Sequence, residues 1–168
     1  GHYKPLKVQL TISPSMDIQV ASNFERLLFD INSCNSDKTL NLMKDLNEKR
    51  EFKIEKKELK KIKDNFLSDS LSEEETKFII AETYKDYGIL VDPHTAIGIG
   101  VAKKITLEGK VVVLATAHPS KFSDVVIQAT NIKPDLPEDL SNILVEKENY
   151  NKMPKDLEKV KNYILERI

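Results

Sequence analysis

The segment from Lys110 to Ala115 constrains the fold more than any other part of the sequence. After its lysine it consists of five successive apolar residues, in the run KVVVLA. Such a run is typical of a strand buried on both faces of a parallel sheet, and that strand needs neighbouring strands on both sides. Strand-like alternation recurs only at 8–12, beside a short apolar group at 89–91. The sequence supplies too few strands for the sheet it predicts, so we expect the chain to be part of a larger protein.

Helical periodicity covers most of the remaining sequence, because apolar residues recur there at spacings of three and four. Ser72 and Glu75 are spaced as a capping box, which marks a helix start, and Gly88 is a typical C-terminal stop. Alternating strands, polar turns and helices predict an α/β fold that is rich in helix. The predicted helices cover 17–32, 36–49, 53–66, 72–88, 92–104, a segment ending near 130, and 154–168, the last with Leu157, Val160, Ile164 and Ile168 facing inward.

Composition and charge exclude several classes of function. The net charge of −1 leaves no excess of positive charge to attract nucleic acid or an anionic membrane surface. No apolar run approaches the roughly 18 residues of a membrane span, and residues 1–5 lack the apolar core of a signal peptide, which favours a cytoplasmic location. The single cysteine, Cys34, excludes an internal disulfide. The three widely separated histidines have no spacing typical of a metal site.

Polar side chains gather in three turns, each at a predicted strand end or helix start. Ligands of open α/β sheets bind at the carboxyl ends of strands, so these turns are candidate binding elements. No Gly-rich phosphate loop accompanies them, because the five glycines of the chain form neither GxGxxG nor GxxxxGK. The three turns are residues 11–26, 92–95 and 114–122.

Each turn also has a structural interpretation. Asp17 and Asp92 are both suitable N-cap residues for the helices predicted after them. Thr116 directly follows the predicted buried strand, so its hydroxyl either caps the next helix or faces a ligand. His118 is either a catalytic base or a structural residue beside a proline. The residues alone leave these alternatives open.

Taken together, the turns resemble one family of enzymes. The segments TISPSMDIQVASNFERLLFD (11–30), DPHTAIG (92–98) and LATAHPSKF (114–122) resemble, in order and spacing, the C-terminal signatures of the threonine synthase family, of its longer bacterial and fungal type. The resemblance spans essentially all of residues 1–168, which would form the C-terminal portion of such an enzyme. It implies the fold type II (tryptophan-synthase-β-like) architecture of pyridoxal-phosphate enzymes. Residues 33–76 are the least characteristic, and we expect them to form a helical peripheral insertion.

The resemblance implies a carbon–oxygen lyase acting on phosphates. Members of the family convert O-phospho-L-homoserine and water to L-threonine and phosphate, with pyridoxal 5'-phosphate as the electron sink. Their Schiff-base lysine lies in an upstream Phe-Lys-Asp motif, and Gly-rich backbone holds the cofactor phosphate. Neither feature occurs in this sequence. We therefore expect no catalytic residue in this chain, no turnover by the chain alone, and a need for the N-terminal part of the same enzyme.

The resemblance also implies roles for individual residues. Thr116 corresponds to the hydroxyl residue that hydrogen-bonds the pyridine nitrogen of the cofactor. Asp92 corresponds to an acidic position near the far side of the ring. Arginine forks suit phosphate and carboxylate groups, so part of the substrate pocket would be basic. The residues expected in the substrate pocket are Ser15, Asp17, Asn23, Arg26 and His118.

Two other functions remain open at this point. Related pyridoxal-phosphate enzymes dehydrate serine or threonine, so the chain could belong to an amino-acid dehydratase. Alternatively, the same segments could form a non-enzymatic α/β binding module. An upstream coding sequence with a Phe-Lys-Asp motif would contradict the second alternative.

Overall fold

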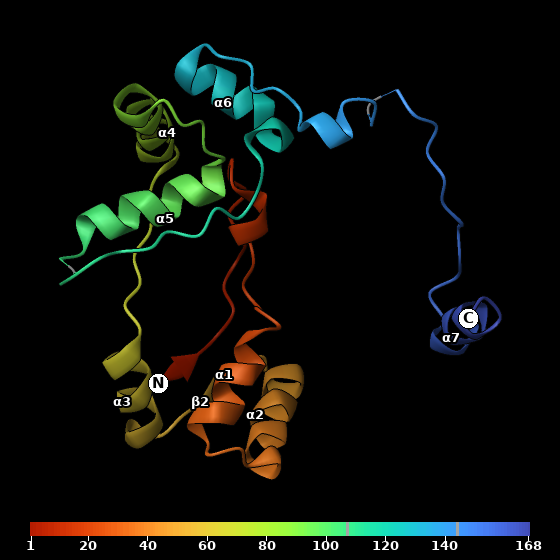
Figure 1. Ribbon diagram of the computed structural model, residues 1–168. Helices are drawn as coiled ribbons and strands as arrows, with labels where there is room; N and C mark the ends of the chain where they lie inside the picture. The colour runs from red at the N-terminus through yellow and green to blue at the C-terminus, as the bar shows by residue number, and fades with distance from the viewer. Residues whose placement is uncertain (107, 144) are drawn as a thin grey trace. The chain divides into compact units, whose positions relative to one another are not determined.

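The computed structural model describes residues 1–106, 108–143 and 145–168 (Figure 1). The chain divides into two compact units, residues 1–134 and residues 135–168, which are described separately below. The described residues are mainly helical, as predicted, and none of their helices is both long and apolar enough to cross a membrane.

The first hydrophobic cluster is built by three helices and a two-stranded antiparallel ribbon. Its buried members are Leu28, Ile31, Leu46 and Phe52. Tyr3 stacks on the Phe52 ring with a centroid distance of 4.9 Å, which closes the ribbon over the helices. The elements of this cluster are β1 (His2–Tyr3), α1 (Phe24–Ile31), α2 (Ser36–Lys49), β2 (Phe52–Lys53) and α3 (Lys56–Asn65).

Most of the expected insertion, residues 33–76, belongs to this first cluster. Leu46 of α2 and Phe52 of β2 share a core with Leu28 of α1. In the same cluster Lys38 of α2 contacts the buried carboxylate of Glu58 on α3, with 2.8 Å between Nζ and Oε1. These helices therefore pack into the same core as α1.

The second hydrophobic cluster is built by three further helices, whose buried apolar residues include Ile79, Ile80 and Ala96. The predicted capping box of Ser72 is present, and Gly88 ends its helix with a φ of 69°, so both predictions are confirmed. Figure 1 shows the three helices grouped together. They are α4 (Glu73–Tyr87), α5 (Pro93–Lys104) and α6 (Ser123–Thr130), preceded by the short 3-10 helix η2 (Pro119–Phe122).

Both predicted strands are wrong for this chain. Residues 8–12 and 110–115 pair with no strand in the described part of the chain, where the only ladder is β1–β2. Val112 is 83% exposed and Leu114 is 75% exposed, although the pattern predicted a strand covered on both faces. A strand forms only against a partner, and the described residues provide none for this segment. The apolar run lies against α5, since a Cβ on Gly98 would stand 3.2 Å from a methyl group of Val113.

The helix predicted at 17–32 also begins later than expected. The residues ahead of it form η1 (Pro14–Met16), a single 3-10 turn, and α1 starts only at Phe24. Asp17 is therefore not an N-cap. Its two carboxylate oxygens accept hydrogen bonds from the backbone and the hydroxyl of Thr11, both at 2.7 Å.

The second unit contains η3 (Glu138–Leu140) and α7 (Leu157–Leu165). The last helix starts at residue 157 after the N-cap Asp156, three residues later than predicted. Among the described residues of this unit none is buried, and Ile168 is 97% exposed. The prediction that the apolar face of this helix points inward is therefore wrong for the chain as described.

Candidate functional site

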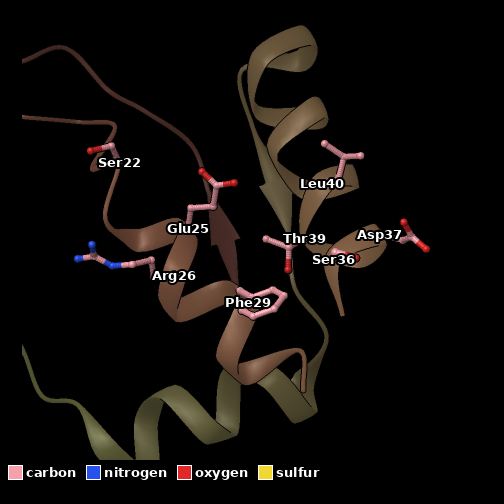
Figure 2. Close-up of a pocket in the computed structure, with 8 residues that line it drawn as sticks. All are labelled: Ser22, Glu25, Arg26, Phe29, Ser36, Asp37, Thr39 and Leu40. Atoms are coloured by element: carbon pink, nitrogen blue, oxygen red, sulfur yellow. The ribbon is translucent and has the colours of Figure 1, made fainter. Parts of the chain in front are cut away.

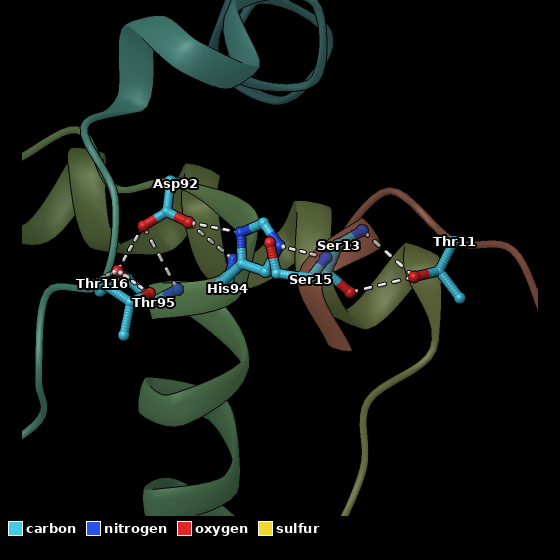
Figure 3. A network of polar contacts seen from close by, with 7 residues as sticks. All are labelled: Thr11, Ser13, Ser15, Asp92, His94, Thr95 and Thr116. Atoms are coloured by element: carbon cyan, nitrogen blue, oxygen red, sulfur yellow. Dashed lines mark hydrogen bonds and ion pairs between the residues drawn. The ribbon is translucent and has the colours of Figure 1, made fainter. Parts of the chain in front are cut away.

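The centre of the candidate site is the carboxylate of Asp92, which is 0% exposed (Figure 3). Asp92 is the N-cap of α5, and Pro93 occupies the first helical position, as predicted. Its Oδ1 accepts hydrogen bonds from His94 N at 2.9 Å and His94 Nδ1 at 2.8 Å. Its Oδ2 accepts from Thr95 N at 3.4 Å and from the Thr95 hydroxyl.

His94 extends this network to the turn around Ser15. The backbone N–H of Ser15 donates to His94 Nε2 at 3.1 Å, across 79 residues of sequence. A ring nitrogen that accepts an N–H carries no proton, so the proton of the neutral imidazole lies on Nδ1 and points to Asp92. The ring is 5% exposed and packs edge-on against Phe122, with centroids 4.7 Å apart. His94 is thus a buried bridge between α5 and the turn.

Thr95 extends the network to Thr116 on the other side. The backbone N–H of Thr116 donates to Thr95 Oγ1 at 3.1 Å. The two hydroxyl oxygens are 3.5 Å apart, which is a weak contact at best. Since the Thr95 hydroxyl already donates to Asp92, the exposed Thr116 hydroxyl keeps most of its hydrogen-bonding capacity for another group.

Thr116 stands at a groove along α5. The groove encloses about 500 Å³. It is lined by α5, at Gly98 and Val101, and by the apolar run from Val111 to Leu114, which meets α5 where Val113 approaches Gly98. Met16, His94 and Thr116 also line the groove. The groove is therefore mainly apolar, with a few polar atoms from the Asp92 network.

Asn23 and Arg26 lie outside this network. Asn23 is an exposed N-cap of α1 whose side chain makes no capping hydrogen bond. Arg26 lines a different groove, of about 710 Å³, between α1 and the start of α2 (Figure 2). The structure therefore does not join these two candidates to the other predicted site residues.

His118 has a local structural role in this chain. It is the N-cap of η2, where its Nδ1 accepts the N–H of Ser120 at 3.3 Å. The same nitrogen is 2.7 Å from the Ser120 hydroxyl. The ring is exposed, and its contacts match the structural interpretation of this residue.

Sequence reasoning missed His94 and Thr95 as members of the site. A local signal for both exists, because the second and third residues after an N-cap aspartate lie within reach of its carboxylate. The link from His94 to Ser15 has no such signal, since it joins segments 79 residues apart. Among the described residues, no group of three or more potential ligands gathers to hold a metal ion.

The comparisons with known proteins all point to one family. Residues 95–164 match the family described as "Threonine synthase, C-terminal". Threonine synthase of Pseudomonas aeruginosa is 37% identical over 157 residues, which cover 92% of this chain and 34% of that protein.

Solved structures agree with the sequence comparison. A pyridoxal-phosphate-bound threonine synthase from Brucella melitensis matches 98% of this chain with a TM-score of 0.80 and 38% identity, over 36% of its own chain. The yeast threonine synthase matches 99% of this chain with a TM-score of 0.76 and 30% identity, over 38% of its own. The chain thus spans about a third of the length of these relatives.

Proposed function

We propose that this chain, which is related to the C-terminal region of threonine synthases over nearly its whole length, forms the ring-side wall of a pyridoxal-phosphate site in such an enzyme. The reaction is the conversion of O-phospho-L-homoserine and water to L-threonine and phosphate. The observation that carries the proposal is the position of Thr116. Its hydroxyl is exposed at an apolar groove, while its backbone is held by a fully buried carboxylate through Thr95.

The residues of the groove fit the ring of the cofactor but not its phosphate. A pyridine ring is flat and apolar on both faces with a polar nitrogen at its edge, and this groove offers apolar walls with one free hydroxyl at Thr116. The sequence contains no Gly-rich backbone to hold a phosphate. In this proposal the remainder of the enzyme binds the phosphate and supplies the Schiff-base lysine.

The cofactor, when bound, supplies an electron sink for the amino-acid substrate. The residues of this chain orient it. The Thr116 hydroxyl would donate a hydrogen bond to the ring nitrogen and, unlike a carboxylic acid, would not protonate it. The apolar walls at Gly98, Val101 and Val113 exclude water from the ring faces.

Asp92 takes a holding role in this proposal rather than a contact with the ring. Both of its oxygens already accept two hydrogen bonds from the start of α5, and its side chain is fully buried. The turn containing Ser15 and Asp17 forms the substrate side. Asn23, Arg26 and His118 stay predictions for the substrate pocket, because their contacts in this chain are separate from the network.

A chimeric enzyme tests the proposal. In Pseudomonas aeruginosa threonine synthase, the matching third is replaced by this chain. We expect the chimera to release L-threonine and phosphate in equal amounts from O-phospho-L-homoserine, and neither half alone to do so. A folded, cofactor-bound chimera that forms no threonine would contradict the proposal. Dehydration of L-serine or L-threonine by that chimera would favour the dehydratase alternative instead.

A separate measurement tests whether the chain alone lacks the catalytic lysine. The chain is incubated with pyridoxal phosphate, reduced with borohydride and digested for peptide mass analysis. We expect scattered, substoichiometric labelling of surface lysines, because none of the described residues that line the groove beside Thr116 is a lysine. A stoichiometric adduct at one lysine would overturn this expectation.

A further inference from the structure

We propose that His94 and Thr95 are positioning residues through which Asp92 controls two sides of the site independently. His94 fixes the backbone at Ser15, on the substrate side, and Thr95 fixes the backbone at Thr116, on the cofactor side. The hydrogen-bond part of this inference concerns the chain itself. Its consequences for substrate and cofactor rest on the function proposed above.

The independence of the two arms follows from how the carboxylate oxygens are shared. Among the described residues, Oδ1 accepts from His94 alone, through its backbone N–H and Nδ1. Within the same part of the chain, Oδ2 accepts from Thr95 alone, through its backbone N–H and hydroxyl. The arms thus share a carboxylate but no oxygen atom (Figure 3). Loss of one arm leaves the acceptor of the other unchanged.

The His94 arm depends on both ring nitrogens. Nδ1 donates to Asp92, and this leaves Nε2 as an acceptor for the N–H of Ser15 at 3.1 Å. The ring cannot rotate freely, because it is 5% exposed and packed against Phe122. The turn at Ser15 is tied to the same helical group once more, since the N–H of Ile12 donates to Glu73 at 3.1 Å. His94 therefore determines the orientation of an already anchored turn.

The Thr95 arm depends on the hydroxyl alone. That hydroxyl donates to Asp92 Oδ2 and accepts the N–H of Thr116 at 3.1 Å. Because its proton is committed to the carboxylate, its lone pair faces Thr116. The hydrogen bond to Thr95 thus fixes the backbone of Thr116, and the Thr116 hydroxyl stays available for the cofactor.

Amide hydrogen exchange in the full chain measures each arm without cofactor or substrate. His94→Asn keeps a donor near the Nδ1 position but is too short to reach Ser15, whereas His94→Gln places an acceptor near the Nε2 position. We expect His94→Asn to speed exchange of the Ser15 amide about tenfold, and His94→Gln to restore part of its protection. The Thr116 amide should exchange at its original rate in both variants.

Variants of Thr95 supply the reciprocal test. Thr95→Val removes the hydroxyl and should speed exchange of the Thr116 amide about tenfold, with the Ser15 amide unchanged. Thr95→Ser retains the hydroxyl and should restore the protection. The proposal is overturned if His94→Asn leaves the Ser15 amide protected. It is also overturned if either variant speeds both amides equally, because that pattern indicates general loosening of α5.

The chimeric enzyme then tests the two consequences. We expect His94→Asn to raise KM for O-phospho-L-homoserine about fivefold, with a smaller change in kcat and no change in the absorbance of bound cofactor. We expect Thr95→Val to shift that absorbance and to lower kcat. Identical kinetic effects of both variants would contradict separate control of the two sides. A chimera that forms no threonine contradicts the proposed function, whereas the amide measurements still decide whether the arms exist.

Discussion

The two hydrophobic clusters of residues 1–134 each contain a buried carboxylate, and the two carboxylates have different hydrogen-bond partners. Glu58 in the first cluster is 6% exposed and contacts a cation, the Lys38 ammonium at 2.8 Å. That hydrogen bond lowers the pKa of Glu58 below its ordinary value. Asp92 in the second cluster is fully buried, and its donors in the described chain are backbone N–H groups, a hydroxyl and an imidazole N–H.

The difference separates a packing role from a site role. The Lys38–Glu58 pair joins two helices of the first cluster, and Lys38 also lies 3.6 Å from Glu55, so its contacts stay within that cluster. The donors of Asp92 continue to the backbone of Ser15 and Thr116, which lie in the two turns with the candidate site residues. A buried polar group is costly unless its hydrogen bonds are made, so the complete set of donors around Asp92 indicates where the geometry is most tightly specified.

The largest expected effect is the loss of Asp92. In the isolated chain, Asp92→Ala removes the N-cap of α5 and leaves the buried His94 Nδ1–H and the Thr95 hydroxyl without an acceptor. We expect the free energy of unfolding to fall by about 4 kcal/mol. Urea unfolding followed by circular dichroism measures this loss.

Glu58→Gln in the first cluster is the matched control. We expect it to cost about 1 kcal/mol, because the Lys38 side chain is partly exposed and can be solvated by water after the pair is lost. Equal losses for Asp92→Ala and Glu58→Gln would remove the distinction between the two carboxylates.

Leu114 tests whether the second cluster is completed by another part of the enzyme. In the isolated chain Leu114→Ala removes a 75% exposed side chain, so its cost should stay within about 0.5 kcal/mol. In the chimeric enzyme the same segment would be covered as a sheet strand, and we expect a loss of about 3 kcal/mol. Thermal unfolding of both proteins measures the contrast. A similar small effect in both would contradict the strand predicted at residues 110–115.

Thr116→Val tests whether the exposed hydroxyl of Thr116 binds the cofactor ring. We expect it to weaken cofactor binding to the chimera by about 2 kcal/mol, because the ring nitrogen loses its donor. Titration with pyridoxal phosphate, followed by absorbance, measures this change. The stability of the isolated chain should not change, since the residue is exposed and its backbone hydrogen bond is retained.

Thr83→Val is the control for a threonine that has only a packing role. Its buried hydroxyl has no hydrogen-bond partner in the described chain, so a valine of similar shape should preserve or increase stability and leave cofactor binding unchanged. Weaker cofactor binding by Thr83→Val would show that the Thr116 result is not specific to the groove.

The sequence predicted the helices well because their signals are local. A capping serine with a glutamate three residues later, or an aspartate before a proline, specifies a helix start through contacts within one turn. The strand at 110–115 could not be judged in the same way. Its apolar run requires strand partners from elsewhere, and in the described chain it lies beside α5, near Gly98, without pairing with a strand.

The candidate site was predictable to a similar degree. Asp92 and Thr116 were assigned to the site by resemblance, because their turns alone left a structural alternative open, and the structure joins the two residues through Thr95. The role of His94 was not predicted, because a buried bridge to Ser15 depends on the folding of two distant segments. Asn23 and Arg26 were grouped with the others by resemblance, yet the chain holds them around a different core.

The smallest expected effect concerns an exposed carboxylate in the second cluster, Glu75. It accepts the N–H of Ser72 at 2.7 Å, and its other oxygen is 2.8 Å from the Lys104 ammonium. The Lys104 contact, together with the Ser72 N–H, lowers the pKa of Glu75 from 4.5 to about 2. A lowered pKa means that the ionised form favours the folded state. Its contribution is therefore complete above pH 4.5 and disappears as the pH falls toward 2.

Glu75→Gln tests this sign. The amide oxygen still accepts the Ser72 N–H, so only the charge is lost. We expect a melting temperature slightly below that of the unmodified chain at pH 6 and equal to it near pH 2. Glu74→Gln, one residue earlier on the exposed face of α4, should melt like the unmodified chain throughout. If the melting temperature of Glu75→Gln stays below that of the unmodified chain at pH 2, Glu75 stabilises the fold through the geometry of its side chain and not through its charge. The exposed carboxylate would then resemble Asp92, whose geometry matters, more than a solvated ion pair.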